Sequence, residues 1–284
     1  MKATLSASGP LLGALEILVP GASRRTLRQM LSQRRIRVNG EVRVDARHPV
    51  VPGDAMEITA PGVSTKLPYG LEVLYEDSDI IVVHKPVNLL TVATTGERER
   101  TVYACLRAVL KERNPVSKLF IVHRLDKFAS GILVFARSEP VQSLLKGIFQ
   151  RHDIQRKYWA IVEGVVEKNQ GTIKSYLAEN RMMRMYSTDD ETGGKFAVTH
   201  FSVLRRTRGI TSLEVTLETG RKNQIRVHLS EMGHPIVGDR AYGSTTDTLK
   251  RLGLHAFHLC FRHPVTGKLM LFQTDPPPEF VRYL

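Results

Sequence analysis

The first part of the chain repeats apolar positions with the spacing of helices. Apolar residues recur every three or four positions from Leu11 to Val19, and the pattern stops at Pro20. This spacing predicts a short amphipathic helix that ends at the proline. Ser23 is a good N-terminal cap for a second helix. The inner face of that helix would carry Leu27, Met30 and Leu31.

The next segment, IRVNGEVRV, has the pattern of a β-hairpin. Asn39 and Gly40 favour a two-residue turn, which would place Val38 opposite Glu41 and mix apolar and charged positions on one face. A three-residue loop, from Asn39 to Glu41, would instead oppose Val38 to Val42. We expect the longer loop, because a period of two keeps one face of a hairpin buried.

Beyond residue 55 the pattern is dominated by strands. A short strand, MEI, is followed by residues 61–70, whose Pro, Gly, Ser and Thr indicate a linker. Short runs of β-branched and aromatic residues then predict seven strands: LEVLYED, DIIVVHKP, GILVFAR, KYWAIVEG, AVTHFSVL, SLEVTLET and LHAFHLCFRH. Helical patterns are fewer, at residues 102–111, 141–151 and 224–232. The mixture indicates an α+β domain around a mainly antiparallel, mixed sheet.

The composition predicts that the protein binds a polyanion. The 284 residues carry a formal net charge of +13, and residues 21–50 hold eight arginines, two acids and no lysine. The planar guanidinium suits phosphate oxygens, so this cluster predicts nucleic-acid binding rather than a merely solvated face. The eight are Arg24, Arg25, Arg28, Arg34, Arg35, Arg37, Arg43 and Arg47.

Other classes of protein fit the chain poorly. No apolar run approaches the roughly 20 residues that span a bilayer, so we expect no membrane partner. The apolar stretch from Leu11 to Val19 is interrupted by Glu16 and followed by Pro20, which argues against a secretory signal. The two cysteines, Cys105 and Cys260, form no paired motif. We therefore expect a cytoplasmic protein, and nothing in the sequence demands more than a monomer.

The candidate chemistry lies in HRLDKFASGILVFA, residues 123–136. Asp126 stands among His123, Arg124 and Lys127, directly before an apolar run that predicts a buried strand. Nearby cations favour the charged form of an acid. Such a carboxylate could be a nucleophile, a base or a metal ligand, or it could simply balance the local positive charge.

Four segments together resemble the RluA-type pseudouridine synthases. They are YEDSDIIVVHKP, HRLDKFASGILVFA, TGRKNQIRVHLSEMGHPIVGDRAYG and LHAFHLCFRHPVTG, and KYWAIVEG resembles the family's tyrosine-bearing strand. The resemblance covers nearly all of residues 71–284. Residues 10–62 are similar to the S4-type RNA-binding domain that often precedes this catalytic domain. We therefore expect a small α/β RNA-binding domain at residues 10–62, a linker at residues 63–70 and a catalytic domain at residues 71–284.

The resemblance implies a cofactor-free isomerisation of uridine within RNA, in which the base is detached through nitrogen, turned and rejoined through carbon. By matching positions, Asp126 would be the essential carboxylate, acting on either base or sugar, and Arg226 the cation paired with it. Tyr158 would stack on the target base, and Arg124 would enter the RNA where the uridine leaves. The expected substrate is large-subunit ribosomal RNA, with transfer RNA as the alternative. A catalytically silent RNA-binding protein is the rival class.

The cluster of basic residues at Arg24, Arg25, Arg28, Arg34, Arg35 and Arg37 would bind RNA. The chain departs from the family at Asn223, where histidine is usual, and asparagine can still donate and accept hydrogen bonds. A competing zinc motif comprises His255, His258, Cys260 and His263. Along a strand, His258 and Cys260 face one side and the other two face the opposite side. We therefore expect no metal site.

Overall fold

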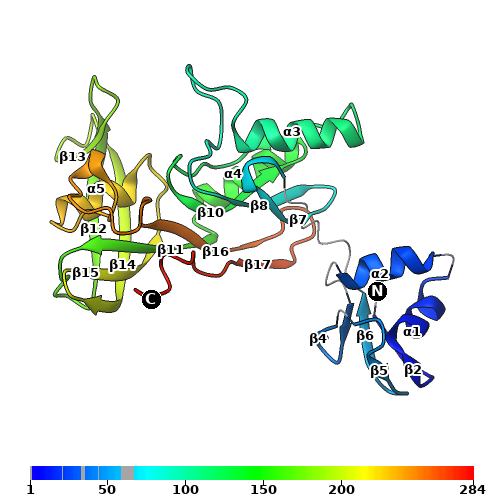
Figure 1. Cartoon of the computed structure of the whole chain (residues 1–284). Coiled ribbons are helices and arrows are strands. Elements are labelled where there is room, and N and C mark those ends of the chain that lie inside the picture. The colour runs from blue at the N-terminus through cyan, green and yellow to red at the C-terminus, as the bar shows by residue number, and fades with distance from the viewer. Residues whose placement is uncertain (1, 21, 33–35, 44, 59–66) are drawn as a thin grey trace. The chain divides into compact units, whose positions relative to one another are not determined.

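The computed structural model describes residues 2–20, 22–32, 36–43, 45–58 and 67–284. The chain divides into two compact units, and the larger contains Asp77–Leu284. Both predicted classes of secondary structure are present in the described part of the chain (Figure 1).

The first unit has two helices against a small sheet. Helices α1 (Leu11–Leu18) and α2 (Arg24–Ser32) confirm the two predicted from the apolar spacing. Leu15 and Leu27 are fully buried, as the inner faces of these helices require. One sheet has the order β1-β6-β3-β4, and β2 pairs with β5. The strands are β1 (Lys2–Thr4), β2 (Gly9–Pro10), β3 (Ile36–Val38), β4 (Glu41–Val42), β5 (Pro49–Val50) and β6 (Ala55–Ile58).

The expected three-residue hairpin loop is wrong. Val38 pairs with Glu41, so the turn consists of Asn39 and Gly40 alone. Both turn residues have positive φ, of 53° and 83°, as the primed two-residue turns require. β4 is a two-residue edge strand, and Glu41 is exposed. The hairpin therefore needs no continuous apolar face on this strand, and the turn chemistry decides the register.

The second unit is built on a sheet of eleven strands with the order β13-β12-β14-β15-β11-β16-β10-β8-β7, extended by β9 and β17. Among the described residues, the strand pairings of this sheet are antiparallel except that of β10 with β16, so the predicted mainly antiparallel mixed sheet is confirmed. Of the helices, α4 packs on β10, and α5 packs on β13 and β14. The start of the predicted linker lies outside the described residues, and its end, Pro68–Gly70, forms a 3-10 turn, η1.

The bounds of these elements follow most of the predicted runs. The strands are β7 (Glu72–Glu76), β8 (Ile80–Lys85), β9 (Phe120–Ile121), β10 (Ser130–Ala136), β11 (Ile154–Glu163), β12 (Gln170–Glu179), β13 (Met185–Thr188), β14 (Lys195–Thr207), β15 (Ile210–Leu217), β16 (Leu254–Arg262) and β17 (Leu269–Gln273). The helices are α3 (Val102–Arg113), α4 (Glu139–Gln150), α5 (Gln224–Glu231) and the 3-10 turn η2 (Arg240–Tyr242).

The parallel pair β10–β16 requires a glycine. Gly131 has φ of +124°, and a Cβ there would lie 2.2 Å from the carbonyl oxygen of Ala256. That contact is with backbone, which cannot swing aside. Every residue of β10 is buried, so the strand has no room to shift.

Gly131→Ala is therefore expected to destabilise the larger unit by about 3 kcal/mol or more, because overpacking and a disfavoured φ act together. Urea unfolding followed by circular dichroism measures this. Gly209→Ala is the matched control: Gly209 has φ of +76°, but nothing lies within 4 Å of its Cβ position. Equal losses in the two variants would show that φ, and not the close approach, is what matters.

Candidate active site

Asp126 lies in a short connection that is hydrogen-bonded to neighbouring segments on both sides of the carboxylate. The connection joins β9 to β10, and the hydroxyl of buried Thr91 donates to the carbonyl of Leu125 at 2.8 Å. The same hydroxyl accepts the Leu125 N–H at 3.2 Å. One residue after the carboxylate, the Lys127 carbonyl accepts a hydrogen bond from Lys85 Nζ at 3.1 Å. Asp126 is therefore held in place by neighbours on either side, while 28% of its side chain remains exposed.

Lys85 is a fully buried amine beneath this connection. Its Nζ also donates to the carbonyls of Pro86 and Leu89, at 2.9 and 2.7 Å. Burial lowers the pKa of Lys85 to about 7, against the opposing influence of the Asp126 carboxylate. The side chain thus connects the end of β8 to the loop that carries Asp126.

Lys85→Met is expected to destabilise the protein by about 2 kcal/mol, because three carbonyls lose their donor. The pKa is about 7 in the fold against 10.5 ordinarily, so between those values the unfolded chain binds a proton that the folded chain releases. The wild-type stability should therefore rise with pH over this range relative to the variant. Urea titrations of both proteins at pH 7 and pH 10 measure the difference. Parallel stability curves would contradict it.

Arg226 reaches Asp126 from α5 and is fixed by a second carboxylate. Its Nη1 lies 3.3 Å from Asp126 Oδ2. Asp239 accepts two bonds from the same guanidinium, Nε to Oδ2 at 2.7 Å and Nη2 to Oδ1 at 2.8 Å. Burial opposes the charge, but the hydrogen bonds and charge of Asp239 raise the pKa of Arg226 above its ordinary value. Such a two-point pair fixes the plane of the guanidinium as well as its position.

Asn223 and Tyr242 complete the surroundings of Arg226. The Asn223 Oδ1 accepts from Arg226 Nη1 at 3.1 Å, and its Nδ2 donates to the Tyr242 hydroxyl at 3.0 Å. The ring of Tyr242 lies 4.7 Å from the guanidinium carbon. Asn223 therefore uses both its donor and its acceptor, as expected for asparagine at this position. Its φ of 54° is one that asparagine tolerates well.

Helix α5 is itself tied to the sheet by its polar buried residues. Gln224 donates to the Val198 carbonyl at 3.0 Å and to Thr199 Oγ1 at 2.9 Å. One turn later, His228 Nδ1 lies 2.8 Å from the same hydroxyl. Burial lowers the pKa of His228 to about 4, so the imidazole is neutral at pH 7. Both anchors lie on the helix that presents Arg226.

Tyr158 and Asp126 line one cleft of about 620 Å³, and Arg226 lines a smaller recess that also contacts both residues. Tyr158 lies on β11 and only 7% of it is exposed. Burial raises the pKa of Tyr158, with an opposing effect of Arg156, so its phenol is uncharged at neutral pH. The structure therefore brings together the three residues that sequence reasoning selected from distant segments.

The expected charge around Asp126 needs one correction. Burial lowers the pKa of His123 to about 3, and its Nε2 accepts the Val134 N–H at 3.1 Å. His123 is thus neutral and contributes no positive charge. Arg124 and Lys127 are exposed, and Arg124 lines the cleft.

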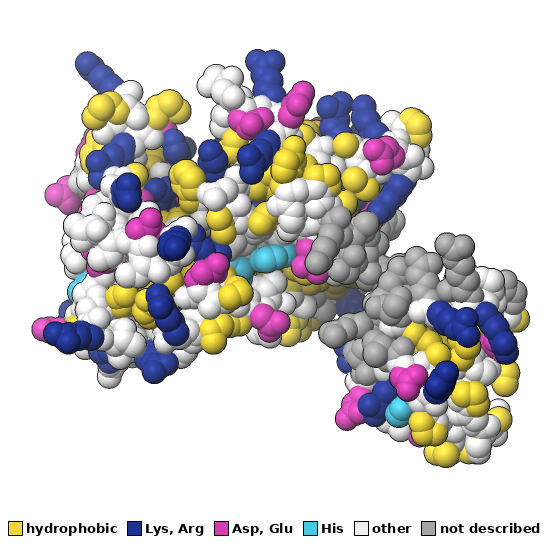
Figure 2. Space-filling model, in the orientation of Figure 1, with side chains coloured by type: hydrophobic (Ala, Val, Ile, Leu, Met, Phe, Trp, Pro, Cys, Tyr) yellow, Lys and Arg dark blue, Asp and Glu magenta, His cyan; other side chains and the backbone are white. Residues whose placement is uncertain are grey.

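The predicted arginine cluster of the first unit is described in part. Arg24, Arg28 and Arg37 are exposed, although Arg24 forms an ion pair with Glu16 at 2.6 Å. Arg25 lies in α2, and its side chain is outside the description. Arg34 and Arg35 lie outside the described residues. On the faces shown in Figure 2, lysine and arginine side chains are spread over both units, with acidic side chains interspersed.

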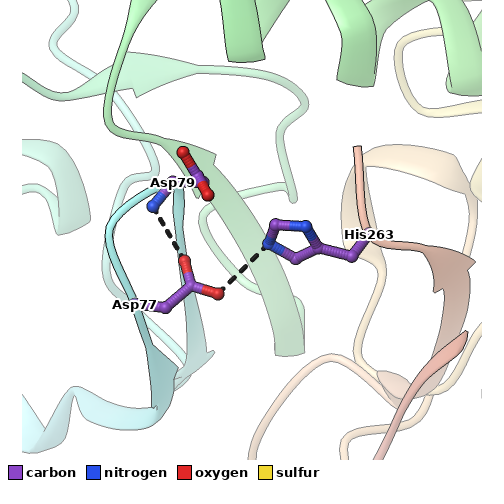
Figure 3. Close-up of side chains that lie close together, drawn as sticks. All are labelled: Asp77, Asp79 and His263. Atoms are coloured by element: carbon purple, nitrogen blue, oxygen red, sulfur yellow. Dashed lines mark hydrogen bonds and ion pairs between the residues drawn. The ribbon is translucent and has the colours of Figure 1, made fainter. Parts of the chain in front are cut away.

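The candidate metal ligands are engaged elsewhere. His255 contacts Ser130 and Thr274 at 2.6 and 2.9 Å, and burial lowers its pKa to about 3. His263 lies instead with Asp77 and Asp79 (Figure 3). Its Nδ1 accepts the N–H groups of residues 265 and 266, so Nε2 carries the hydrogen and lies 3.1 Å from Asp77 Oδ2. A metal ion would need a lone pair on Nε2, which this arrangement does not offer.

Sequence reasoning missed Asp239, Lys85 and Thr91. Asp239 is 3% exposed and Lys85 is fully buried. Buried charged residues are rare unless they are paired, but their burial is not visible in the sequence. Within the quoted segment VGDRAYG, the lone acid after a glycine was the available signal for Asp239.

Comparison with known proteins gives consistent matches for both units. Residues 79–231 match the family described as RNA pseudouridylate synthase, and residues 15–55 match the S4 domain. The ribosomal large subunit pseudouridine synthase D of Pasteurella multocida is 34% identical over 288 residues, covering 94% of this chain and 88% of that protein. The protein of the same name from Vibrio cholerae is 35% identical over 282 residues, covering 91% and 85%.

Solved structures agree with the fold of the larger unit. Human RNA pseudouridylate synthase domain containing 4 aligns with a TM-score of 0.62 at 24% identity, over 74% of this chain and 90% of that chain. Human RNA pseudouridylate synthase domain containing 1 gives a TM-score of 0.57 at 25% identity, over 73% and 84%. No helix among the described residues is both long and apolar enough to cross a membrane.

The fold and the matches define an RNA-modifying enzyme: a synthase domain preceded by an S4 domain that binds RNA. With about a third of its residues identical to relatives over nearly its whole length, the chain belongs to the RNA pseudouridylate synthase family. It is an RNA pseudouridine synthase, as the resemblance implied.

Proposed function

We propose that the protein converts uridine to pseudouridine in large-subunit ribosomal RNA and that Asp126 is its essential carboxylate. The observation that carries the proposal is the pairing of Asp126 with Arg226 in a cleft also lined by Tyr158. The names of the relatives from Pasteurella multocida and Vibrio cholerae support the choice of RNA. Transfer RNA is the alternative substrate. We also propose a cytoplasmic location, because a protein that modifies ribosomal RNA must have access to that RNA.

Each residue has a role that its surroundings suit. Asp126 acts on the nucleotide while Arg226 keeps the carboxylate oriented and balances its charge. Tyr158 offers an uncharged aromatic face to the uracil, and stacking of a base on such a face is worth about 1–3 kcal/mol. Exposed Arg124 contacts RNA at the cleft, in the space that the turned-out uridine vacates. No group outside the chain takes part in the bond changes.

Pseudouridine mapping at nucleotide resolution tests the substrate. Total RNA is compared among a strain lacking the gene, the same strain with the wild-type gene, and the strain with Asp126→Asn. We expect one or more ribosomal uridines to be modified only with the wild-type gene. Modification confined to transfer RNA would overturn the choice of RNA, and wild type that modifies no RNA would overturn the enzyme assignment.

The first unit is expected to contribute affinity rather than chemistry. Replacing Arg24, Arg25 and Arg28 by glutamine should weaken RNA binding and reduce the salt slope by about 2–3, because each of the three phosphate contacts contributes about 0.7–0.9. Filter binding at several salt concentrations measures the slope, and single-turnover rates at saturating protein should stay near wild type. Glu16→Gln is the matched control: it frees Arg24 from its ion pair and should strengthen binding. An unchanged salt slope in the triple variant would show that these three arginines do not contact phosphates.

A further inference from the structure

Arg156 lies in the wall of the cleft and is poorly paired. It stands on β11 two residues before Tyr158, and only 7% of it is exposed. Side chains two positions apart on a strand point to the same face, and both residues line the cleft. Arg156 thus contacts the same space as the residue proposed to receive the uracil.

The guanidinium of Arg156 has donors to spare. An arginine carries five N–H donors. Here Nη2 donates to the Glu218 carbonyl at 3.2 Å, and the buried Nε has no hydrogen-bond partner. Among the described residues, no carboxylate lies within ion-pair distance of Arg156, whereas Arg226 has two. Burial lowers the pKa of Arg156, which is the expected effect on a cation without a counter-ion.

The surroundings hold this cation where it is. The ring of Phe149 lies 5.3 Å from its guanidinium carbon. At Gly220, an added Cβ would stand 2.7 Å from Arg156 Nη1, so the glycine leaves the room that the guanidinium occupies. A buried, fixed and unpaired cation costs stability unless an anion binds to it. Two exposed cations, Lys146 and Arg221, line the same cleft.

We propose that Arg156 binds the phosphodiester that adjoins the target uridine, and so fixes the sugar and base against Asp126 and Tyr158. The inference rests on the proposed function. Residues two apart on a strand are about 6.6 Å apart, roughly the distance from a base to the phosphate of its own nucleotide. A uracil on Tyr158 therefore brings its phosphate to Arg156. The guanidinium fork matches two phosphate oxygens, which a lysine or amide cannot do.

The test combines a variant enzyme with a neutralised phosphate. Short RNAs contain the uridine mapped in the deletion strain, with either ordinary phosphates or one uncharged methylphosphonate on its 5′ or 3′ side. On the ordinary RNA, Arg156→Gln should lower kcat/KM about 10- to 100-fold, the loss of a hydrogen-bonded charge pair. On one of the two methylphosphonate RNAs, the variant and wild type should differ by less than about 3-fold, because the contact is already absent. Exposed Arg205→Gln is the matched control and should equal wild type on every RNA.

Stability separates this role from a structural one. Removing an unpaired buried cation should leave the melting temperature at or above that of wild type. Equal loss of activity on all three RNAs, or a lowered melting temperature with such a loss, would overturn the phosphate assignment. If Arg156→Gln does not fold, the same comparison is made with Gly220→Ala. This variant retains the guanidinium of Arg156 but displaces it from its position. Wild type that is active while Arg156→Gln is unimpaired refutes this inference alone, whereas an inactive wild type refutes the proposed function.

Discussion

Asp126→Asn is expected to abolish pseudouridine formation, with a loss of at least about 10⁴-fold in the single-turnover rate, as when the nucleophile of an enzyme is removed. The amide keeps the size of the carboxylate but loses the charge that Arg226 faces at 3.3 Å. Release of tritium from RNA labelled at C5 of uridine measures the rate, because the new bond forms at that carbon.

The fold and the binding of RNA should survive this change. Asp126 is partly exposed, and Arg226 keeps its two bonds to Asp239, so the free energy of unfolding should change by less than about 1 kcal/mol. Filter binding of the same RNA is the matching control. If the variant binds RNA as wild type does and retains more than about a hundredth of the rate, Asp126 is not the essential carboxylate.

The parts of the fold that sequence could predict are those with a strong local pattern. β10 is an unbroken apolar run, and it is buried at every position. β12, in contrast, was missed because the alternation of its burial is not matched by its residue types. Exposed and half-buried positions alternate from Gln170 to Ser175, but of the half-buried Gly171, Ile173 and Ser175 only the isoleucine has a large apolar side chain. The conformation of β12 is imposed by pairing with β14, with Thr172 opposite His200. Tertiary pairing of this kind leaves little trace in one sequence.

The active site likewise contains residues whose roles depend on tertiary contacts that the local sequence does not reveal. Asp126 and Arg226 are 100 residues apart, and only the family resemblance suggested that they meet. Apart from being a lone acid after a glycine, Asp239 shows no local sign of its importance, because its partner Arg226 comes from a different element. His123 misled for the opposite reason: its neighbours in sequence suggest a cation, but its burial makes it neutral.

The second large effect is expected at Arg226. Arg226→Lys should lower the rate about 100-fold or more, because one ammonium cannot keep two bonds to Asp239 and also contact Asp126. Arg226→Met is a poorer test. It leaves the carboxylate of Asp239, 2% exposed, without a cation and should destabilise the protein by about 3–5 kcal/mol.

A double variant separates the catalytic role of Arg226 from its role in stability. Arg226→Met with Asp239→Leu removes both buried charges, and such replacements are often neutral or stabilising. We expect urea unfolding to show stability restored relative to Arg226→Met, while the tritium-release rate stays at the level of that single variant. Recovery of the rate together with stability would mean that Arg226 acts only through folding. Persistent inactivity in a stable protein ties the guanidinium to Asp126, because no other described residue forms an ion pair with that carboxylate.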